Sequence, residues 1–281
     1  MTLSTVRIIA GLTLKEAARR KVLRSLAVLT AVLLGLSAWG FWRLDIEFGT
    51  LTSGESRLAA SQVLNLVMFG LSLIAALGTA FLAGPTVSGE VESGVALAMM
   101  TRPVRRSAVL AGKWLGLVTF GAGYIVLTGL AQFLIVKATL GYWPPHPIAG
   151  LLLLAAQTAV LLTLGLLLST AIAPMASGII AVGLFGATWI AGVVGAVGEE
   201  LHNESVAQVG TVSRMILPTD GLWRGAMHAF QDPAAVQFAA TFGASPFLSM
   251  VPTPVAYVGW AAVWTALILA LAALSFQRRD L

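Results

Sequence analysis

The sequence has no cysteine among its 281 residues, and only 10% of the residues are charged. The absence of cysteine excludes disulfides, thiolate metal ligands and cysteine nucleophiles. Soluble domains carry roughly 25% charged residues, so a chain this poor in charge would expose large apolar patches to water. Lipid tolerates such a surface. The composition therefore argues against an ordinary soluble enzyme and for a membrane protein.

Long apolar runs recur along the chain, and one bilayer crossing needs about 20 mostly apolar residues. The sequence therefore predicts an all-α polytopic membrane protein, a single domain over residues 1–281 with about six transmembrane helices. The predicted spans cover residues 26–41, 58–84, 115–140, 148–171, about 178–197 after a short turn at 174–178, and 255–274.

Three segments outside the spans are distinctive. Residues 1–24 are amphipathic and basic, which is typical of a helix lying in the membrane interface. Residues 85–113 form the most polar internal segment. The connector 198–254 contains two short apolar pieces, 215–217 and 236–242, which predict interfacial or re-entrant helices.

Lys and Arg residues divide unevenly between the two sides of the predicted bundle, and cytoplasmic loops carry the excess. One side holds twelve, namely Arg7, Lys15, Arg19, Arg20, Lys21, Arg24, Arg102, Arg105, Arg106, Lys113, Arg278 and Arg279. The other side holds five, namely Arg43, Arg57, Lys137, Arg214 and Arg224. We therefore expect both termini and residues 85–113 to face the cytoplasm, and the connector 198–254 to face outward.

The sequence offers little for catalysis. A P-loop needs Gly-x-x-x-x-Gly-Lys-Ser/Thr, but around the single Gly-Lys pair at 112–113 Ser107 replaces the first glycine and Trp114 replaces the hydroxyl residue. The three histidines lack the spacing of a zinc protease. Acid–base chemistry would have to use Glu199, Glu200, His202 and Asp220 in the outer connector. Their simpler interpretation is that they are solvated loop charges.

Polar residues inside the predicted spans are few, and no acidic residue lies at the centre of a span. Asn65, Gln132 and Gln157 are the main candidates for intramembrane polar contacts. Interhelical hydrogen bonds explain these amides about as well as contact with a substrate does. Gly112 and Gly116 form a GxxxG motif, which favours close packing within the bundle, with a dimer interface as the alternative.

The segment 85–113 is patterned more than an ordinary loop. The Gly84–Pro85 pair predicts the end of one helix and the start of a short new one, with Pro in its first turn. Acidic groups suit a helix N-terminus, and Glu90 and Glu92 would lie there. An apolar patch follows, namely Val95, Leu97, Ala98, Met99 and Met100. We interpret the segment as a docking surface. The alternative is a basic loop with ordinary helix caps.

Three stretches of this region resemble the signature of ABC-2 type transporter permeases: GPTVSGEVESG at 84–94, TRPVRR at 101–106 and LAGKWLG at 110–116. The resemblance extends to the number of spans, the N-terminal helix, the outer re-entrant region and the FQRRDL tail. The stretch ILPTDGLW at 216–223 is similar to the outer segment of the branch that serves nitrous-oxide-reductase maturation, although Leu217 stands where that branch often has Asn.

The resemblance implies a permease subunit of an ABC exporter that is not itself an enzyme. It implies a second permease chain, as a homodimer or heterodimer, and two copies of a separate ATPase that hold the ATP and Mg; it implies no cofactor on this chain and no nucleic-acid partner. Residues 2–20 would be an elbow helix on the inner leaflet of a bacterial cytoplasmic membrane. The segment between the second and third spans would contain a coupling helix, at residues 87–100, that docks on the ATPase. The ATPase-coupling residues would be Glu90, Glu92, Gly94, Met99, Arg102, Pro103, Arg105 and Arg106.

Two alternatives to export remain open on the sequence. A permease of this kind in an ATP-driven maturation or mechanotransmission complex, which moves no substrate, would have the same sequence features. A membrane-embedded enzyme with its site in the outer connector is the other alternative. The sequence does not identify a substrate.

Overall fold

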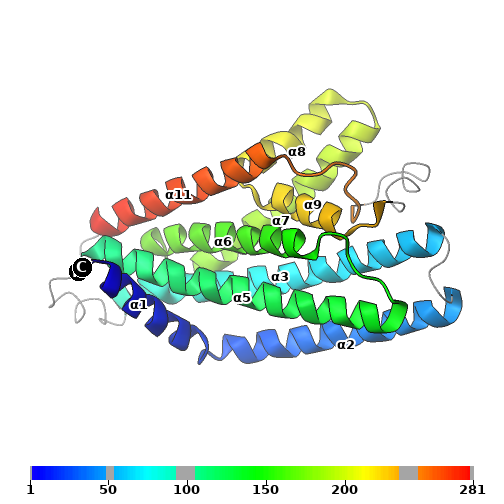
Figure 1. The fold of residues 1–281 in the computed structure, drawn as a ribbon. Coiled ribbons are helices and arrows are strands. Elements are labelled where there is room, and N and C mark those ends of the chain that lie inside the picture. Colours follow the sequence, from blue (N-terminus) through cyan, green and yellow to red (C-terminus); the bar gives the residue numbers. More distant parts are fainter. Residues whose placement is uncertain (1, 49–53, 93–104, 234–245, 279–281) are drawn as a thin grey trace.

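The computed structural model describes residues 2–48, 54–92, 105–233 and 246–278. Within these ranges the chain is helical and contains no β-strand. The helices are α1 (Thr2–Ala17), α2 (Val22–Phe48), α3 (Gly54–Glu92), α5 (Arg106–Leu140), α6 (Pro147–Ala171), α7 (Pro174–Glu200), α8 (Glu204–Ile216), α9 (Thr219–Phe230) and α11 (Val255–Arg278). Figure 1 shows them as an elongated bundle.

Six of these helices are long and apolar enough to cross a membrane: α2, α3, α5, α6, α7 and α11. The prediction of about six spans in an all-α membrane protein is confirmed. The two central helices are α3 and α6, because 67% and 61% of their most apolar windows are buried, against 17% in α2 and in α11. The peripheral helices therefore present their apolar side chains outward, as a lipid-facing surface does.

The second span does not end at Gly84, so the predicted new helix starting at Pro85 is wrong. α3 continues through Pro85 to Glu92. Proline removes one intrahelical hydrogen bond, but a membrane helix tolerates it where nearby side chains satisfy the backbone. The turns around Pro85 carry additional side-chain bonds: Thr86 Oγ1 donates to the Leu82 carbonyl at 2.6 Å, and Ser88 Oγ donates to the Gly84 carbonyl at 2.8 Å.

The third span likewise begins earlier than predicted, at Arg106. With 39 residues, α3 is about 58 Å long, and with 35 residues α5 is about 52 Å long, at about 1.5 Å per residue. A bilayer's hydrocarbon core is only about 30 Å thick. Both helices therefore extend beyond the membrane core, and the predicted polar loop 85–113 consists largely of their ends.

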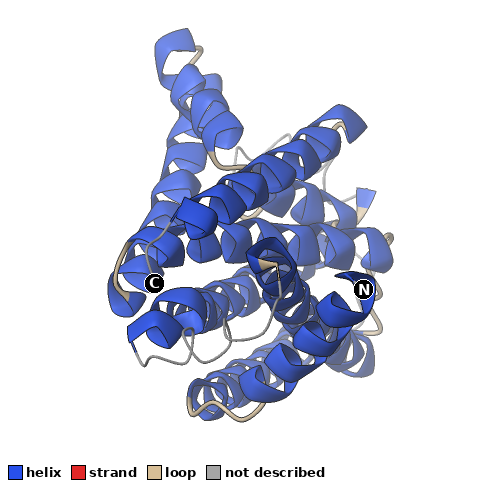
Figure 2. Cartoon of the chain, turned by 90° about the vertical axis from the view of Figure 1, so that its left-hand side faces the viewer, coloured by secondary structure: helices blue, strands red, loops and turns tan. Residues whose placement is uncertain are grey.

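The N-terminal helix α1 packs along the first turns of α5 through the GxxxG motif. A Cβ atom on Gly112 would come within 2.8 Å of Ile9, and one on Gly116 within 2.6 Å of the Ala10 carbonyl oxygen. Close approach within the chain therefore explains these two glycines, as the packing interpretation expected. Both termini lie at this end of the bundle (Figure 2).

In its described part, the outer connector forms the helices α8 and α9, and only α8 reaches one of the two apolar pieces that predicted helices. α8 packs back against α7, where Gly195 and Gly210 let the two backbones touch. α9 packs against α6 and buries Trp223 and Phe230 almost completely. The predicted apolar piece 215–217 is the end of α8 and the residue after it, whereas the piece 236–242 lies outside the described residues.

Candidate functional sites at the two ends of the bundle

The predicted coupling residues lie where α3 ends and α5 begins. Glu90 and Glu92 are on the last turn of α3 and not on the first turn of a new helix, so their expected role at a helix N-terminus is wrong. Arg105 is the exposed N-cap residue of α5. The remaining predicted contacts lie outside the described residues, namely Gly94, Met99, Arg102 and Pro103.

Arg106 joins this segment to the end of the chain. Its Nη1 donates to the carbonyl oxygens of Phe276 at 3.4 Å and Gln277 at 3.2 Å, in the last turn of α11. A guanidinium near the C-terminus of a helix is favourable, since the last carbonyls have no intrahelical donors. The start of α5 and the end of α11 are therefore linked.

Lys113 is buried, at 5% exposure, although the sequence placed it in a polar loop. Its Nζ donates to the Thr86 carbonyl at 2.7 Å, one residue after Pro85. A buried ammonium is costly unless it is hydrogen-bonded, so this contact fixes the turn of α3 around Pro85 to α5. Glu16 of α1 and Arg20, which follows this helix, line the same junction and form an ion pair at 2.6 Å.

The three predicted intramembrane amides each bind a distant part of the chain. Asn65 Nδ2 donates to the Phe247 carbonyl at 2.8 Å, and Gln132 Nε2 donates to Ser37 Oγ at 2.7 Å. Gln157 Oε1 accepts from Ser72 Oγ at 2.8 Å. Interhelical bonding therefore accounts for Gln132 and Gln157, whereas Asn65 binds the segment that precedes α11. Within the described ranges, the side-chain oxygens of Asn65 and Gln132 have no hydrogen-bond partner, so these two amides keep unused accepting capacity inside the bundle.

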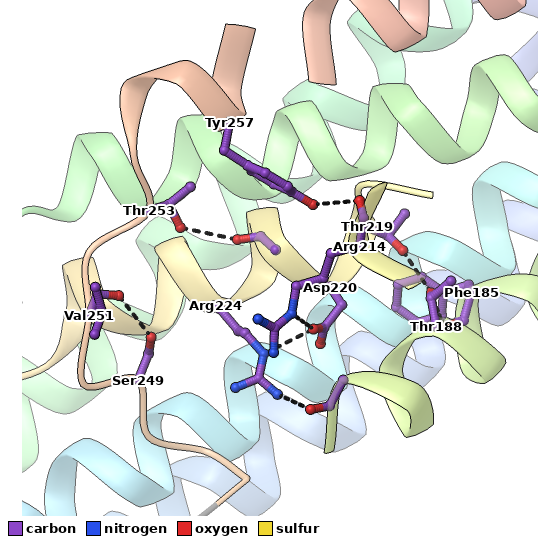
Figure 3. A network of polar contacts seen from close by, with 12 residues as sticks. Phe185, Thr188, Arg214, Thr219, Asp220, Arg224, Ser249, Val251, Thr253 and Tyr257 are labelled. Carbon is purple, nitrogen blue, oxygen red and sulfur yellow. Dashed lines mark hydrogen bonds and ion pairs between the residues drawn. The ribbon is translucent and has the colours of Figure 1, made fainter. Parts of the chain in front are cut away.

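At the opposite end of the bundle, Asp220 is the centre of a buried ion-pair cluster (Figure 3). Its Oδ2 accepts from Nε of Arg214 at 3.0 Å and from Nε of Arg224 at 2.9 Å, and its side chain is only 1% exposed. Arg224 Nη2 also donates to the Gly192 carbonyl at 2.6 Å. A Cβ atom on Gly192 would collide with the Asp220 carboxylate. The interpretation of Asp220 as a solvated loop charge is therefore wrong.

Three aromatic residues of α11 hold the C-terminal end of α8. Tyr257 Oη, Trp260 Nε1 and Trp264 Nε1 donate to three consecutive carbonyls, those of Arg214 at 3.0 Å, Met215 at 3.2 Å and Ile216 at 2.8 Å. The last carbonyls of a helix lack intrahelical donors, and lipid cannot supply them. The i, i+3, i+7 spacing of the aromatics places them on one face of α11. The sequence showed the aromatics but not their partners.

The outer cluster borders a cavity of about 490 Å³ between the end of α7, α8, α9 and the segment before α11. The lining includes Arg214, Arg224, Glu199 and Glu200 but neither His202 nor Asp220. His202 is exposed, and Asp220 is engaged by two arginines. The acid–base group considered from the sequence is therefore not assembled as a group around this cavity. No cluster of three potential metal ligands occurs in the described part of the chain.

Residues 67–281 match the family model described as ABC-2 family transporter protein. The match covers most of α3 and every later helix, including both ends of the bundle described above. None of the curated proteins matches the chain. The match is to the family as a whole, and the resemblance to the nitrous-oxide-reductase-maturation branch stays a prediction.

Proposed function

The chain belongs to the ABC-2 family of transporter proteins, and on that premise we propose that it is the membrane-spanning permease subunit of an ABC exporter. It is an integral membrane protein, and its described part contains six helices that are long and apolar enough to cross a membrane. The sequence contains no P-loop, so in this proposal ATP and Mg are bound by a separate ATPase subunit. The family is a membrane component of transport systems and is not catalytic by itself.

The extension of α3 and α5 beyond the membrane core supports this proposal most directly. Two rigid helices flank residues 93–105, and Lys113 fastens one helix to the other at Thr86. α1 packs against the same part of α5. A force applied to residues 93–105 would be transmitted to the bundle, because α3 continues as a helix through Pro85 and Lys113 ties it to α5. Such an arrangement suits a docking surface for an ATPase.

The remaining features of the proposal follow from the family and from the charge distribution. Two ATPase copies would act on two permease chains, in a homodimer or a heterodimer. Both termini and residues 93–105 would face the cytoplasm, because most Lys and Arg residues lie at that end. The membrane would be the cytoplasmic membrane of a bacterium, with export toward the end that carries α8 and α9.

Affinity co-purification from the native membrane tests the proposal. The tagged wild-type chain is expected to bring down an ATP-binding subunit, and the double variant Glu90→Arg, Glu92→Arg is expected to lose it. The matched control is Glu199→Arg, Glu204→Arg, which makes the same charge change at exposed positions at the other end of the bundle.

The control should retain the ATPase subunit at the wild-type level. Absence of any ATPase from the folded wild-type preparation would refute the permease assignment. Loss of the ATPase from both double variants would instead refute the location of the docking surface.

A further inference from the structure

The cavity beside α8 and α9 carries charges of both signs on separate walls. Its volume, about 490 Å³, lies within the range of about 300–1,000 Å³ that is usual for small-molecule sites. Arg214 and Arg224 form one wall, and Glu199 and Glu200, at the end of α7, form another. Neither the proposed ATPase docking nor the helix packing uses this cavity.

The arginine wall has hydrogen-bond donors to spare. Each guanidinium uses Nε on Asp220, and Arg224 uses Nη2 on the Gly192 carbonyl. Among the described residues, neither terminal nitrogen of Arg214 has a partner, nor has Nη1 of Arg224. These side chains are only 21% and 17% exposed. Two partly buried guanidinium groups whose terminal nitrogens are available form a site suited to a phosphate or carboxylate group.

The charge balance decides what kind of anion fits. Two arginines and Asp220 sum to one positive charge, because +2 and −1 give +1. Adding Glu199 brings the sum to 0, because +1 and −1 cancel. A purely anionic ligand would be repelled by the glutamate wall. A ligand with an anionic group at the arginines and a cationic group toward the glutamates would be attracted by both walls.

The third wall is largely apolar and belongs to the segment that leads into the membrane-crossing helix α11. Leu248, Met250, Val251, Pro252 and Pro254 line it. Met250 and Val251 are 42% and 70% exposed, and α11 begins at once after this segment. An apolar ligand moiety would thus continue from the cavity along the lipid-facing surface.

We propose that this outer cavity binds a zwitterionic headgroup carrying a phosphate and an amine, presented by a lipid of the adjoining leaflet. The phosphate contacts the terminal nitrogens of Arg214 and Arg224. The amine lies toward Glu199, and the start of the acyl region lies against Met250 and Val251. This lipid-binding site is a proposal in addition to the permease role, because ATPase docking at the far end of the bundle does not require it.

Native mass spectrometry of the full-length chain released from detergent measures the binding. The probes are dihexanoyl-phosphatidylethanolamine, dihexanoyl-phosphatidylglycerol and the soluble headgroup O-phosphoethanolamine. The ethanolamine lipid is expected to bind more tightly than the glycerol lipid, which lacks the amine. Comparison with O-phosphoethanolamine identifies the source: binding of the lipid alone means a membrane lipid, and equal binding of the soluble headgroup means a soluble phosphoamine.

Two variants test the two walls separately, a third fills the cavity, and a fourth is a control. Arg214→Gln should weaken binding of both lipids by about tenfold or more, since it removes charge-assisted donors. Glu199→Gln, at an exposed position outside the ion-pair cluster, should abolish the preference for ethanolamine over glycerol. Ala196→Trp should fill the cavity from α7 and abolish binding. Arg43→Gln, an exposed arginine on α2, should bind like wild type.

Equal binding of the two lipids by the wild-type chain would overturn the proposal, as would binding that survives Ala196→Trp. Failure of all three probes to bind would show that the arginine wall is only hydrated. The permease assignment would stand in each case, because its own test measures ATPase retention.

Discussion

Replacing Asp220 by asparagine tests whether the outer cluster is a buried ion pair. The substitution keeps the shape of the side chain but leaves two guanidinium groups next to a neutral amide. Removing one partner of a buried ion pair costs about 3–5 kcal/mol, because the remaining charge is uncompensated. Arg214 and Arg224 retain 21% and 17% exposure, so water solvates them in part. We therefore expect a loss near the lower end, about 3 kcal/mol.

Thermal unfolding in detergent, followed by tryptophan fluorescence, measures this loss. About 2–3 °C of Tm per kcal/mol is expected for a chain of this size, so Asp220→Asn should lower the Tm by about 6–9 °C. The double variant Asp220→Asn, Arg214→Gln should recover part of the loss, because it also removes one of the uncompensated charges.

Asp45→Asn is the matched control, since Asp45 lies half-exposed near the end of α2. It should change the free energy of unfolding by less than about 0.5 kcal/mol. The buried-pair reasoning is wrong if the Tm of Asp220→Asn lies within about 1–2 °C of the Tm of this control. It is also wrong if adding Arg214→Gln to Asp220→Asn lowers the Tm by as much as Arg214→Gln does in the wild-type chain.

Two further substitutions probe the opposite ends of the bundle. Gly192→Ala should lower the free energy of unfolding by about 1–3 kcal/mol, because its Cβ would meet the fixed Asp220 carboxylate. The control Gly186→Ala, where a Cβ has no neighbour within 4 Å, should raise the free energy of unfolding by up to about 1 kcal/mol. Thermal unfolding compares the two variants. Lys113→Met should reduce the amount of co-purified ATPase by about tenfold, because it removes a charged hydrogen bond from α5 to α3. The control Lys137→Met, at the far end of α5, should leave the amount of co-purified ATPase unchanged.

The sequence was sufficient for features that depend on local composition. Each membrane-crossing helix is an apolar run of about 20 residues or more, and bilayer thickness alone requires that. The interruption at Pro85 was interpreted wrongly, because proline usually ends a helix in water. The donor that stabilises this turn, Lys113, lies on another helix and 27 residues away. No local pattern reveals a contact of that kind.

The outer cluster was predictable only in part. Asp220 and Arg224 are four residues apart, a spacing that places them on one helix face once α9 is assumed. Arg214 joins them across the turn between α8 and α9, and Gly192 makes room for them from α7. Those contributions depend on how three helices meet. The four chemically interesting connector residues therefore looked alike in the sequence, although one is buried and paired and the others line a cavity or face solvent.

α11 connects the two ends of the molecule. It therefore links the proposed ATPase-docking segment, residues 93–105, to the outer cavity. At one end Arg106, directly after the docking segment, binds the carbonyls of Phe276 and Gln277. At the other end Trp264 and Tyr257 bind the carbonyls that end α8, one of which belongs to Arg214. A helix resists compression along its axis because each turn is hydrogen-bonded to the next. An axial displacement of the start of α5 is therefore expected to shift α8, and with it the arginine wall of the cavity.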